Sequence, residues 1–238
     1  MPRGCSLARV FVAVSALLAG ACATAPDAPP FQNPSREPRT FGAGDPKLTY
    51  VVMGDSTAAG QGAPYDDGIA VGTARELART RSVSLINLGV SGARMSDVTR
   101  DQLAAAQRAK PDVVLLAAGA NDVTHLTPIR SIERNLRAIV SGLRTANPNV
   151  TIIVTGSPDM STPPRVPRLL RGIASWRTRK VNAMVRRVAI ESNLTFAPIA
   201  DETGPLFARD RTLFDVDRFH PNTRGYAAWL AVLNRALR

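Results

Sequence analysis

The stretch Lys47–Gly60, KLTYVVMGDSTAAG, contains the pattern that decides the fold. Its first half is apolar and rich in β-branched residues, which is typical of a buried strand. Gly54 ends that run, and the small residues after it predict a turn that places the hydroxyl of Ser56 directly behind the strand. A turn of this kind lies where an α/β protein presents reactive groups, at the carboxyl edge of its sheet.

The same alternation of strand and helix continues along the chain. Five apolar runs predict strands, and the segments between them carry apolar residues at helical spacing. Because parallel strands need crossover connections, this pattern predicts one α/β domain over residues 47–238, with helices on both faces of a five-stranded parallel sheet. The predicted strands are 47–53, 84–88, 112–117, 151–155 and 195–199, and the predicted helices are 70–79, 96–108, 129–145, 173–191 and 223–237.

The first 23 residues have the layout of a signal peptide. Arg3 and Arg9 flank the start of the apolar run Val10–Ala19, which is short for a membrane span. Ala21–Ala23 fits the small-residue preference of a signal peptidase. The four residues that end at Cys22 also resemble a bacterial lipobox, in which this cysteine is acylated. We therefore predict export, either as a secreted protein or as one held at the cell envelope through Cys22.

Residues 24–46 follow as a separate segment with six prolines, which predicts an extended tether. The two cysteines of the chain are Cys5 and Cys22, so the predicted domain contains no disulfide and no thiolate metal site. The domain must then rely on its core for stability. We expect a monomer.

The chain is strongly basic, with a formal net charge of +11. Its basic residues are spread along the sequence and only 5% of residues are aromatic, so we find no nucleic-acid-binding motif. The segment 161–190 has eight basic residues and no acidic one, which is typical of a solvated helix face. The alternative hypothesis is docking on an anionic membrane or cell-wall surface. The eight residues are Arg165, Arg168, Arg171, Arg177, Arg179, Lys180, Arg186 and Arg187.

A serine hydroxyl needs a base to remove its proton, and the base needs an acceptor that orients it. The chain has two histidines, His125 and His220. Asp217 precedes His220 by three residues, a spacing that lets the two side chains meet on one side of a turn. An isolated pair of this kind is more often a helix cap, and Asp215 is an alternative carboxylate. We interpret His125 as a surface or loop residue.

Two further positions offer N–H donors for a developing oxyanion. Asn121, in the sequence GAND after the third predicted strand, has a neutral amide, although an Asx turn would also explain it. Gly92, after the second predicted strand, lets its backbone N–H approach a substrate without a Cβ in the way. A plain strand-to-helix turn is the alternative for that glycine.

Taken together and in this order, Ser56, Gly92, Asn121 and the pair Asp217-x-x-His220 resemble the SGNH (GDSL-type) hydrolase family. The resemblance extends from Tyr50 to about Tyr226. It implies a flavodoxin-like three-layer α/β/α sandwich, in agreement with the alternation of strands and helices.

The resemblance also implies a role for each matching position. Ser56 is the expected nucleophile and, through its backbone N–H, the first oxyanion donor. Gly92 and Asn121 are the expected second and third donors. His220 is the expected general base and Asp217 its orienting partner. Thr57 stands where the family motif has Leu, and no metal or organic cofactor is implied.

The resulting hypothesis is an exported serine esterase that hydrolyses carboxylic esters, either acyl lipids or acetylated carbohydrate, through an acyl-enzyme. The alternative is a catalytically silent cell-surface module that binds through its Arg-rich face. We expect the loops at 63–68 and 158–172 to shape the substrate pocket.

Overall fold

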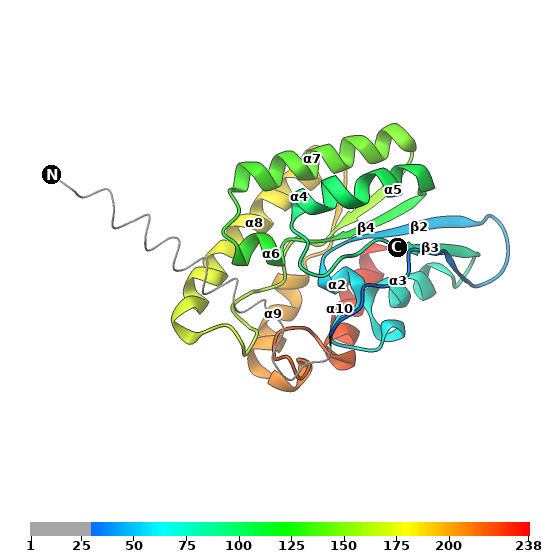
Figure 1. Ribbon diagram of the computed structural model, residues 1–238. Coiled ribbons are helices and arrows are strands. Elements are labelled where there is room, and N and C mark those ends of the chain that lie inside the picture. The colour runs from blue at the N-terminus through cyan, green and yellow to red at the C-terminus, as the bar shows by residue number, and fades with distance from the viewer. Residues whose placement is uncertain (1–29) are drawn as a thin grey trace.

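The structure is a computed structural model that describes residues 30–238. It contains a six-stranded sheet between two layers of helices (Figure 1). The predicted signal peptide, residues 1–23 with Cys22, lies outside the described residues. Among residues 30–238, no helix combines the length and the hydropathy needed to span a membrane.

Five of the strands are parallel and correspond to the five predicted ones. The parallel strands lie in the order β3-β2-β4-β5-β6, with β2 near the centre. Counted along the chain, this is the order 2-1-3-4-5 of flavodoxin-like proteins, so the predicted architecture is confirmed. The strands are β2 (Leu48–Gly54), β3 (Val83–Asn87), β4 (Val113–Ala117), β5 (Thr151–Val154) and β6 (Thr195–Phe196).

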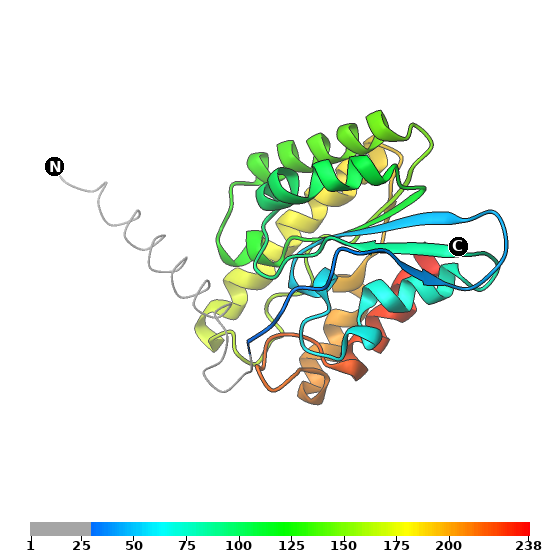
Figure 2. The ribbon, with the colours of Figure 1, turned by 45° about the vertical axis from the view of Figure 1, so that its right-hand side comes forward.

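Alternate residues of each strand point to opposite faces of the sheet and feed two separate cores. Val51 and Met53 belong to one core together with Leu136 of α7, whereas Tyr50 and Val52 belong to the other. The first core lies under four helices, which form one layer in Figures 1 and 2. They are α4 (Met95–Asp97), α5 (Leu103–Ala109), α7 (Ile129–Ala146) and α8 (Arg171–Glu191).

The second core lies under helices from opposite ends of the chain. Ile69 of α3, Phe207 of α9 and Trp229 of α10 pack there, so the C-terminal helices cover the sheet beside α3. These helices are α3 (Ile69–Leu77), α9 (Ile199–Arg209) and α10 (Thr223–Ala236). Two short helices, α2 (Ser56–Ala59) and α6 (Ala120–Thr124), begin directly after β2 and β4, at the carboxyl edge of the sheet.

Besides the short helices α2 and α6, the structure has two further elements that the sequence pattern did not reveal. Strand β1 (Arg39–Phe41) pairs antiparallel with β3, within the stretch for which the prolines predict a tether. The Arg39 guanidinium of this strand forms an ion pair with Asp66, which holds the segment against the rest of the domain. Helix α9 begins where the fifth strand was expected to end and contains Pro205, a residue that obscures a helical pattern.

The turn after β2 positions Ser56 through two buried side chains. Gly54 has φ +142°, and a Cβ there would lie 1.8 Å from the carbonyl oxygen of Ala117, so only glycine fits. The amide of Gln102 accepts from the Gly54 N–H at 2.9 Å and donates to the Gly54 carbonyl at 2.8 Å. Asp55 then caps α2 by accepting from the N–H and hydroxyl of Thr57.

We predict that Gln102→Leu lowers the free energy of unfolding by about 2–4 kcal/mol, because two buried backbone groups of Gly54 lose their partners. Urea unfolding measures the change. Gln107→Leu is the matched control, since Gln107 is half-buried and donates one hydrogen bond, to the Gly142 carbonyl. Equal losses for the two variants would contradict the importance of the Gln102 contacts.

We also predict a pH dependence of stability that originates at Asp55. Burial raises the pKa of Asp55 to about 6, although the hydrogen bonds from Thr57 by themselves lower this pKa. Between about pH 4 and pH 6 the unfolded chain loses this proton first, so stability falls as the pH rises through that window. In the parent protein the free energy of unfolding should fall by on the order of 1–3 kcal/mol across this window, and Asp55→Asn should abolish the fall. Urea unfolding at a series of pH values measures it, and the same pH dependence in both proteins would refute the prediction.

Candidate active site

Ser56 and His220, 164 residues apart in sequence, lie in direct contact. The Nε2 atom of His220 is 2.8 Å from the Oγ atom of Ser56. The serine is the first residue of α2, and the histidine lies in the loop between α9 and α10. Both side chains are buried. The predicted meeting of these two residues is therefore present in the fold.

Asp217 holds the other side of the His220 ring. Its Oδ2 atom is 2.5 Å from Nδ1 of His220, and its Oδ1 atom accepts the backbone N–H groups of Phe219 and His220 at 2.8 and 2.9 Å. Because an ionised carboxylate only accepts hydrogen bonds, Nδ1 carries the proton and Nε2 is left to accept from Ser56. The sequence left Asp217 and Asp215 as candidates for this role, and Asp217 is the one that contacts the His220 ring.

The surroundings keep the Asp217 carboxylate ionised. Burial by itself raises the pKa of Asp217, but the hydrogen bond and charge of the His220 ring and the two backbone N–H groups outweigh it. The net result is a pKa below the usual range for an aspartate. The group is thus suited to orient an imidazole and to stabilise its protonated form.

Asn121 and Gly92 follow β4 and β3, as the sequence predicts; Asn121 lies in α6 and Gly92 in a turn. The Asn121 side chain is buried, lines the same cavity as Ser56, and donates one hydrogen bond from Nδ2 to the carbonyl of Ala93 at 3.0 Å. Its second amide hydrogen is left for another acceptor. Gly92 has φ +83°, and a Cβ there would meet no atom within 4 Å.

Two residues that sequence reasoning missed connect the Gly92 turn to the rest of the site. The backbone N–H of Ser91 donates to the Asn33 side chain at 2.8 Å, and the Ser91 hydroxyl donates to Gln61 at 2.7 Å. The backbone N–H of Gln61 in turn donates to the Ser56 carbonyl at 2.9 Å. No sequence signal marks Asn33 or Gln61, because each is identified by contacts with distant segments.

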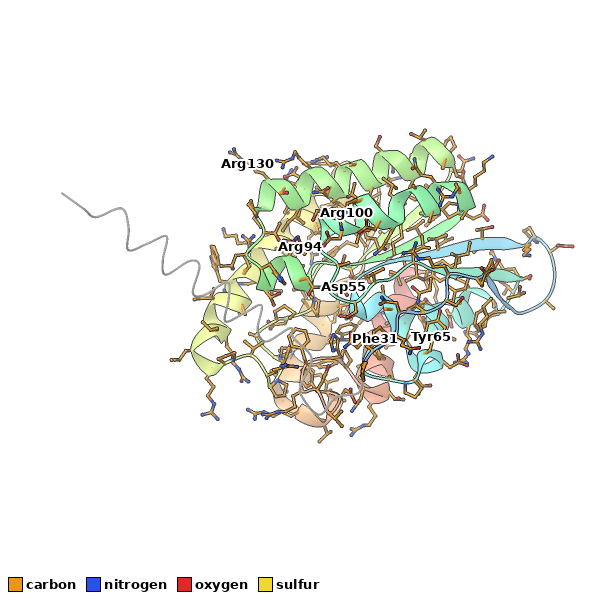
Figure 3. The ribbon with its side chains drawn as sticks, viewed as in Figure 1. Phe31, Asp55, Tyr65, Arg94, Arg100 and Arg130 are labelled. Atoms are coloured by element: carbon orange, nitrogen blue, oxygen red, sulfur yellow. The ribbon has the colours of Figure 1, made fainter. Side chains whose placement is uncertain are left out.

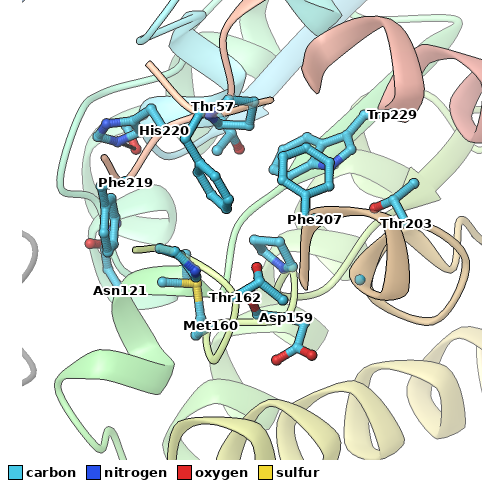
Figure 4. Close-up of a pocket in the computed structure, with 17 residues that line it drawn as sticks. Thr57, Asn121, Asp159, Met160, Thr162, Thr203, Phe207, Phe219, His220 and Trp229 are labelled. Atoms are coloured by element: carbon cyan, nitrogen blue, oxygen red, sulfur yellow. Dashed lines mark hydrogen bonds between the residues drawn. The ribbon is translucent and has the colours of Figure 1, made fainter. Parts of the chain in front are cut away.

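A mostly apolar cavity opens beside Ser56 and His220. Figure 4 shows aromatic rings and the Met160 side chain around it, drawn from α9, α10, the loop after β5 and the loop that carries His220. Its apolar lining includes Pro158, Met160, Pro163, Phe207, Phe214, Phe219, Pro221 and Trp229.

The two loops expected to shape the pocket differ in their placement. Of the expected loop 158–172, the part 158–163 lines the cavity, whereas 164–172 is absent from its lining. The segment 63–68 does not; Tyr65 instead lines a separate groove with Phe31 of the N-terminal segment (Figure 3). His125 is exposed at the end of α6 and is absent from the cavity lining.

Within residues 30–238, no cluster of three or more His, Cys, Asp or Glu side chains is arranged to hold a metal ion. The groups that meet at the cavity are a buried serine, an imidazole oriented by a carboxylate, and an adjacent amide donor.

Comparison with known proteins identifies a family and a relative whose sequences match most of this chain. The model of the GDSL-like lipase/acylhydrolase family matches residues 52–228. The chain is 30% identical over 194 residues to a GDSL-like esterase of Mycobacterium tuberculosis; the match covers 79% of this chain and 61% of that relative. The chain thus spans about three fifths of the length of that protein.

Solved structures of low sequence identity share the fold. A lipase from a goat rumen metagenome has a TM-score of 0.65 and 18% identity, with 79% of this chain and 97% of that chain covered. An acetyl-xylooligosaccharide esterase mutant from a Geobacillus species has a TM-score of 0.56 and 19% identity, with 82% of this chain and 96% of that chain covered. Because the family model matches about three quarters of its length, the chain belongs to the GDSL-like lipase/acylhydrolase family, whose members hydrolyse esters.

Proposed function

We propose that this chain is a serine esterase in which Ser56 is the nucleophile, His220 the general base and Asp217 its orienting partner. The observation that carries the proposal is the continuous chain of hydrogen bonds from Asp217 through the His220 ring to the Ser56 hydroxyl. A buried serine paired in this way has a base within reach of its proton, which is the first requirement for nucleophilic attack.

In the first half of the reaction, the Ser56 Oγ atom attacks the ester carbonyl carbon while Nε2 of His220 takes the hydroxyl proton. The carbonyl oxygen becomes negatively charged. When the tetrahedral intermediate collapses, the ester C–O bond breaks, and the His220 imidazolium returns the proton to the departing alkoxide. The products are an alcohol and an acyl group on Ser56.

In the second half, a water molecule takes the place of the alcohol. His220 removes one proton from this water as its oxygen attacks the acyl carbon, and the same proton then returns to Ser56 as the acyl bond breaks. Asp217 stabilises the positive charge on the imidazolium in both halves. A carboxylic acid is released and the starting state is restored.

Three N–H groups are proposed to hold the oxyanion. The backbone N–H of Ser56 lies in the first turn of α2, where the helix provides no carbonyl to accept it. The free amide hydrogen of Asn121 comes from α6, and the backbone N–H of Gly92 from the turn after β3. Neutral donors held in place by the fold stabilise the developing charge without reorganisation.

The cavity indicates which side of the ester it receives. Its aromatic and aliphatic lining favours an acyl chain over a polar leaving group, because an apolar wall cannot satisfy the hydroxyl groups of a sugar. The proposed substrates are carboxylic esters of acyl lipids or acetylated carbohydrate, with the acyl group in this cavity. The predicted signal peptide supports export of the enzyme to the cell envelope or beyond.

We predict that Ser56→Ala lowers kcat for p-nitrophenyl esters at least about a thousandfold, and that Asn121→Ala lowers it by about 10²–10³. Reaction with a fluorophosphonate should attach one label, at Ser56, as measured by peptide mass spectrometry. Unchanged turnover of both p-nitrophenyl esters and acetylated xylan by Ser56→Ala would refute the assignment.

The matched control for the triad compares its two candidate acids. Asp217→Asn should lower kcat by about 10⁴, because the amide favours the wrong tautomer of His220. Asp215→Asn should leave kcat within about twofold, since the Asp215 side chain does not contact the ring. The reverse result would assign the orienting role to Asp215.

We also predict that Met160→Ala shifts the preference of the enzyme toward longer acyl chains. Removing the Met160 side chain widens the cavity beside Ser56, and one methylene in an apolar pocket changes the relative kcat/KM by about tenfold or more. The measurement is kcat/KM for a graded series from acetate to octanoate. Met184→Ala, which truncates an equally buried methionine outside the cavity, should leave the preference unchanged.

A further inference from the structure

The start of α8 exposes large apolar side chains to solvent. Leu169, Ile173 and Trp176 have 94%, 37% and 51% of their surfaces exposed. Their spacing of four and three residues places them on one face of the turn Arg168–Leu170 and the helix that follows. Leu170, in the same segment, is buried in the first core, so the segment that carries the exposed residues is packed against the domain.

The basic residues around this face differ from those farther along α8. Arg186 pairs with Asp201, and Arg187 pairs with Glu133 and Glu191, so their charges are neutralised within the molecule. In the part of the chain that the structure describes, six basic residues near the apolar face form no ion pair with a carboxylate; one of them, Arg177, is buried and donates to the Thr127 carbonyl. They are Arg165, Arg168, Arg171, Arg177, Arg179 and Lys180.

This surface adjoins the candidate active site. The loop that leads into it, residues 158–163, lines the cavity beside Ser56. The Arg165 N–H donates to the carbonyl of Arg218 at 3.0 Å, which joins the segment to the loop that carries His220. In that loop Val216 is 74% exposed. In Figure 1 the turn before α8 projects from the molecule on the side of the sheet's carboxyl edge.

From these observations we propose that the start of α8 is a membrane-docking face, which places Leu169, Ile173 and Trp176 in the interfacial layer of an anionic bilayer while Arg168 and Lys180 contact lipid headgroups. The apolar residues select this partner, because an acidic polymer in water would stabilise the cations but would gain nothing from exposed Leu, Ile and Trp. A bilayer interface stabilises both, with tryptophan at headgroup level and cations beside anionic lipid.

The docking face would present the cavity to esters at a lipid surface, and in this respect the inference builds on the proposed function. Its test does not depend on catalysis, because binding is measured with the full-length Ser56→Ala variant. A failure of docking and a failure of ester hydrolysis are therefore separate results.

Tryptophan fluorescence provides a local reporter. The chain has two tryptophans, and Trp229 is buried whereas Trp176 is half-exposed. We expect vesicles of phosphatidylcholine and phosphatidylglycerol with brominated acyl chains to quench Trp176. A leader or lipid anchor elsewhere in the chain could hold the protein on a vesicle, but it would not by itself bring Trp176 to the acyl chains. In Trp176→Phe the remaining fluorescence should resist quenching.

Paired variants separate the apolar and electrostatic contributions. Leu169→Ser with Ile173→Ser should weaken the quenching-derived vesicle affinity at least about tenfold. Arg168→Gln with Lys180→Gln should weaken it about 25-fold, and only for the anionic vesicles. The controls are Ile190→Ser, at the far end of α8, and Lys47→Gln with Arg81→Gln, at the opposite edge of the sheet; both should bind as the parent does.

Three results would overturn the proposal. One is the absence of Trp176 quenching by anionic vesicles. Another is equal quenching in the docking-face variants and their controls. The third is binding to a soluble polyanion such as polyphosphate with no quenching by vesicles, which would assign the face to an acidic polymer.

On a soluble short-chain ester, the docking-face variants in the parent background should keep the parental kcat/KM.

Discussion

The hydrogen bond between Ser56 and His220 closes the candidate site, and much of the surrounding structure serves to bring its two ends together. The Tyr226 hydroxyl at the start of α10 donates to the carbonyl of Gln61 at 2.6 Å, so the helix after His220 is fixed to the segment after Ser56. Gly62 makes the approach sterically feasible, because a Cβ there would lie 2.4 Å from the carbonyl oxygen of Pro221.

Buried carboxylates surround this contact, and each accepts hydrogen bonds from N–H or O–H donors. Asp55 caps α2, and Asp217 accepts two backbone amides besides the histidine ring. Asp122, whose pKa is raised by burial, accepts the Met95 N–H at 2.9 Å and so joins the turn after β4 to the start of α4. A polar network of this kind is rigid because breaking any member leaves a buried group without a partner.

The same loops connect the site to the surface. Met160 faces the cavity, whereas Leu169 and Trp176, nine and sixteen residues later, face solvent. One short segment therefore has an inward face that suits an acyl chain and an outward face that suits a lipid interface. Farther along α8 the charges of Arg186 and Arg187 are paired within the molecule, which confines the unpaired cations to the end near the site.

The sequence by itself determined the features that depend on neighbouring residues. β-Branched runs and helical spacing identified the five parallel strands and the longer helices, because both patterns follow from local backbone geometry. Ser56 directly after a strand and the Asp217-x-x-His220 turn were visible for the same reason. Tertiary structure alone decided strand β1, the contacts of Asn33 and Gln61, and the position of the 63–68 loop away from the cavity. Each of these depends on segments that are distant in sequence, as in the pairing of Arg39 with Asp66, and no local pattern encodes such a contact.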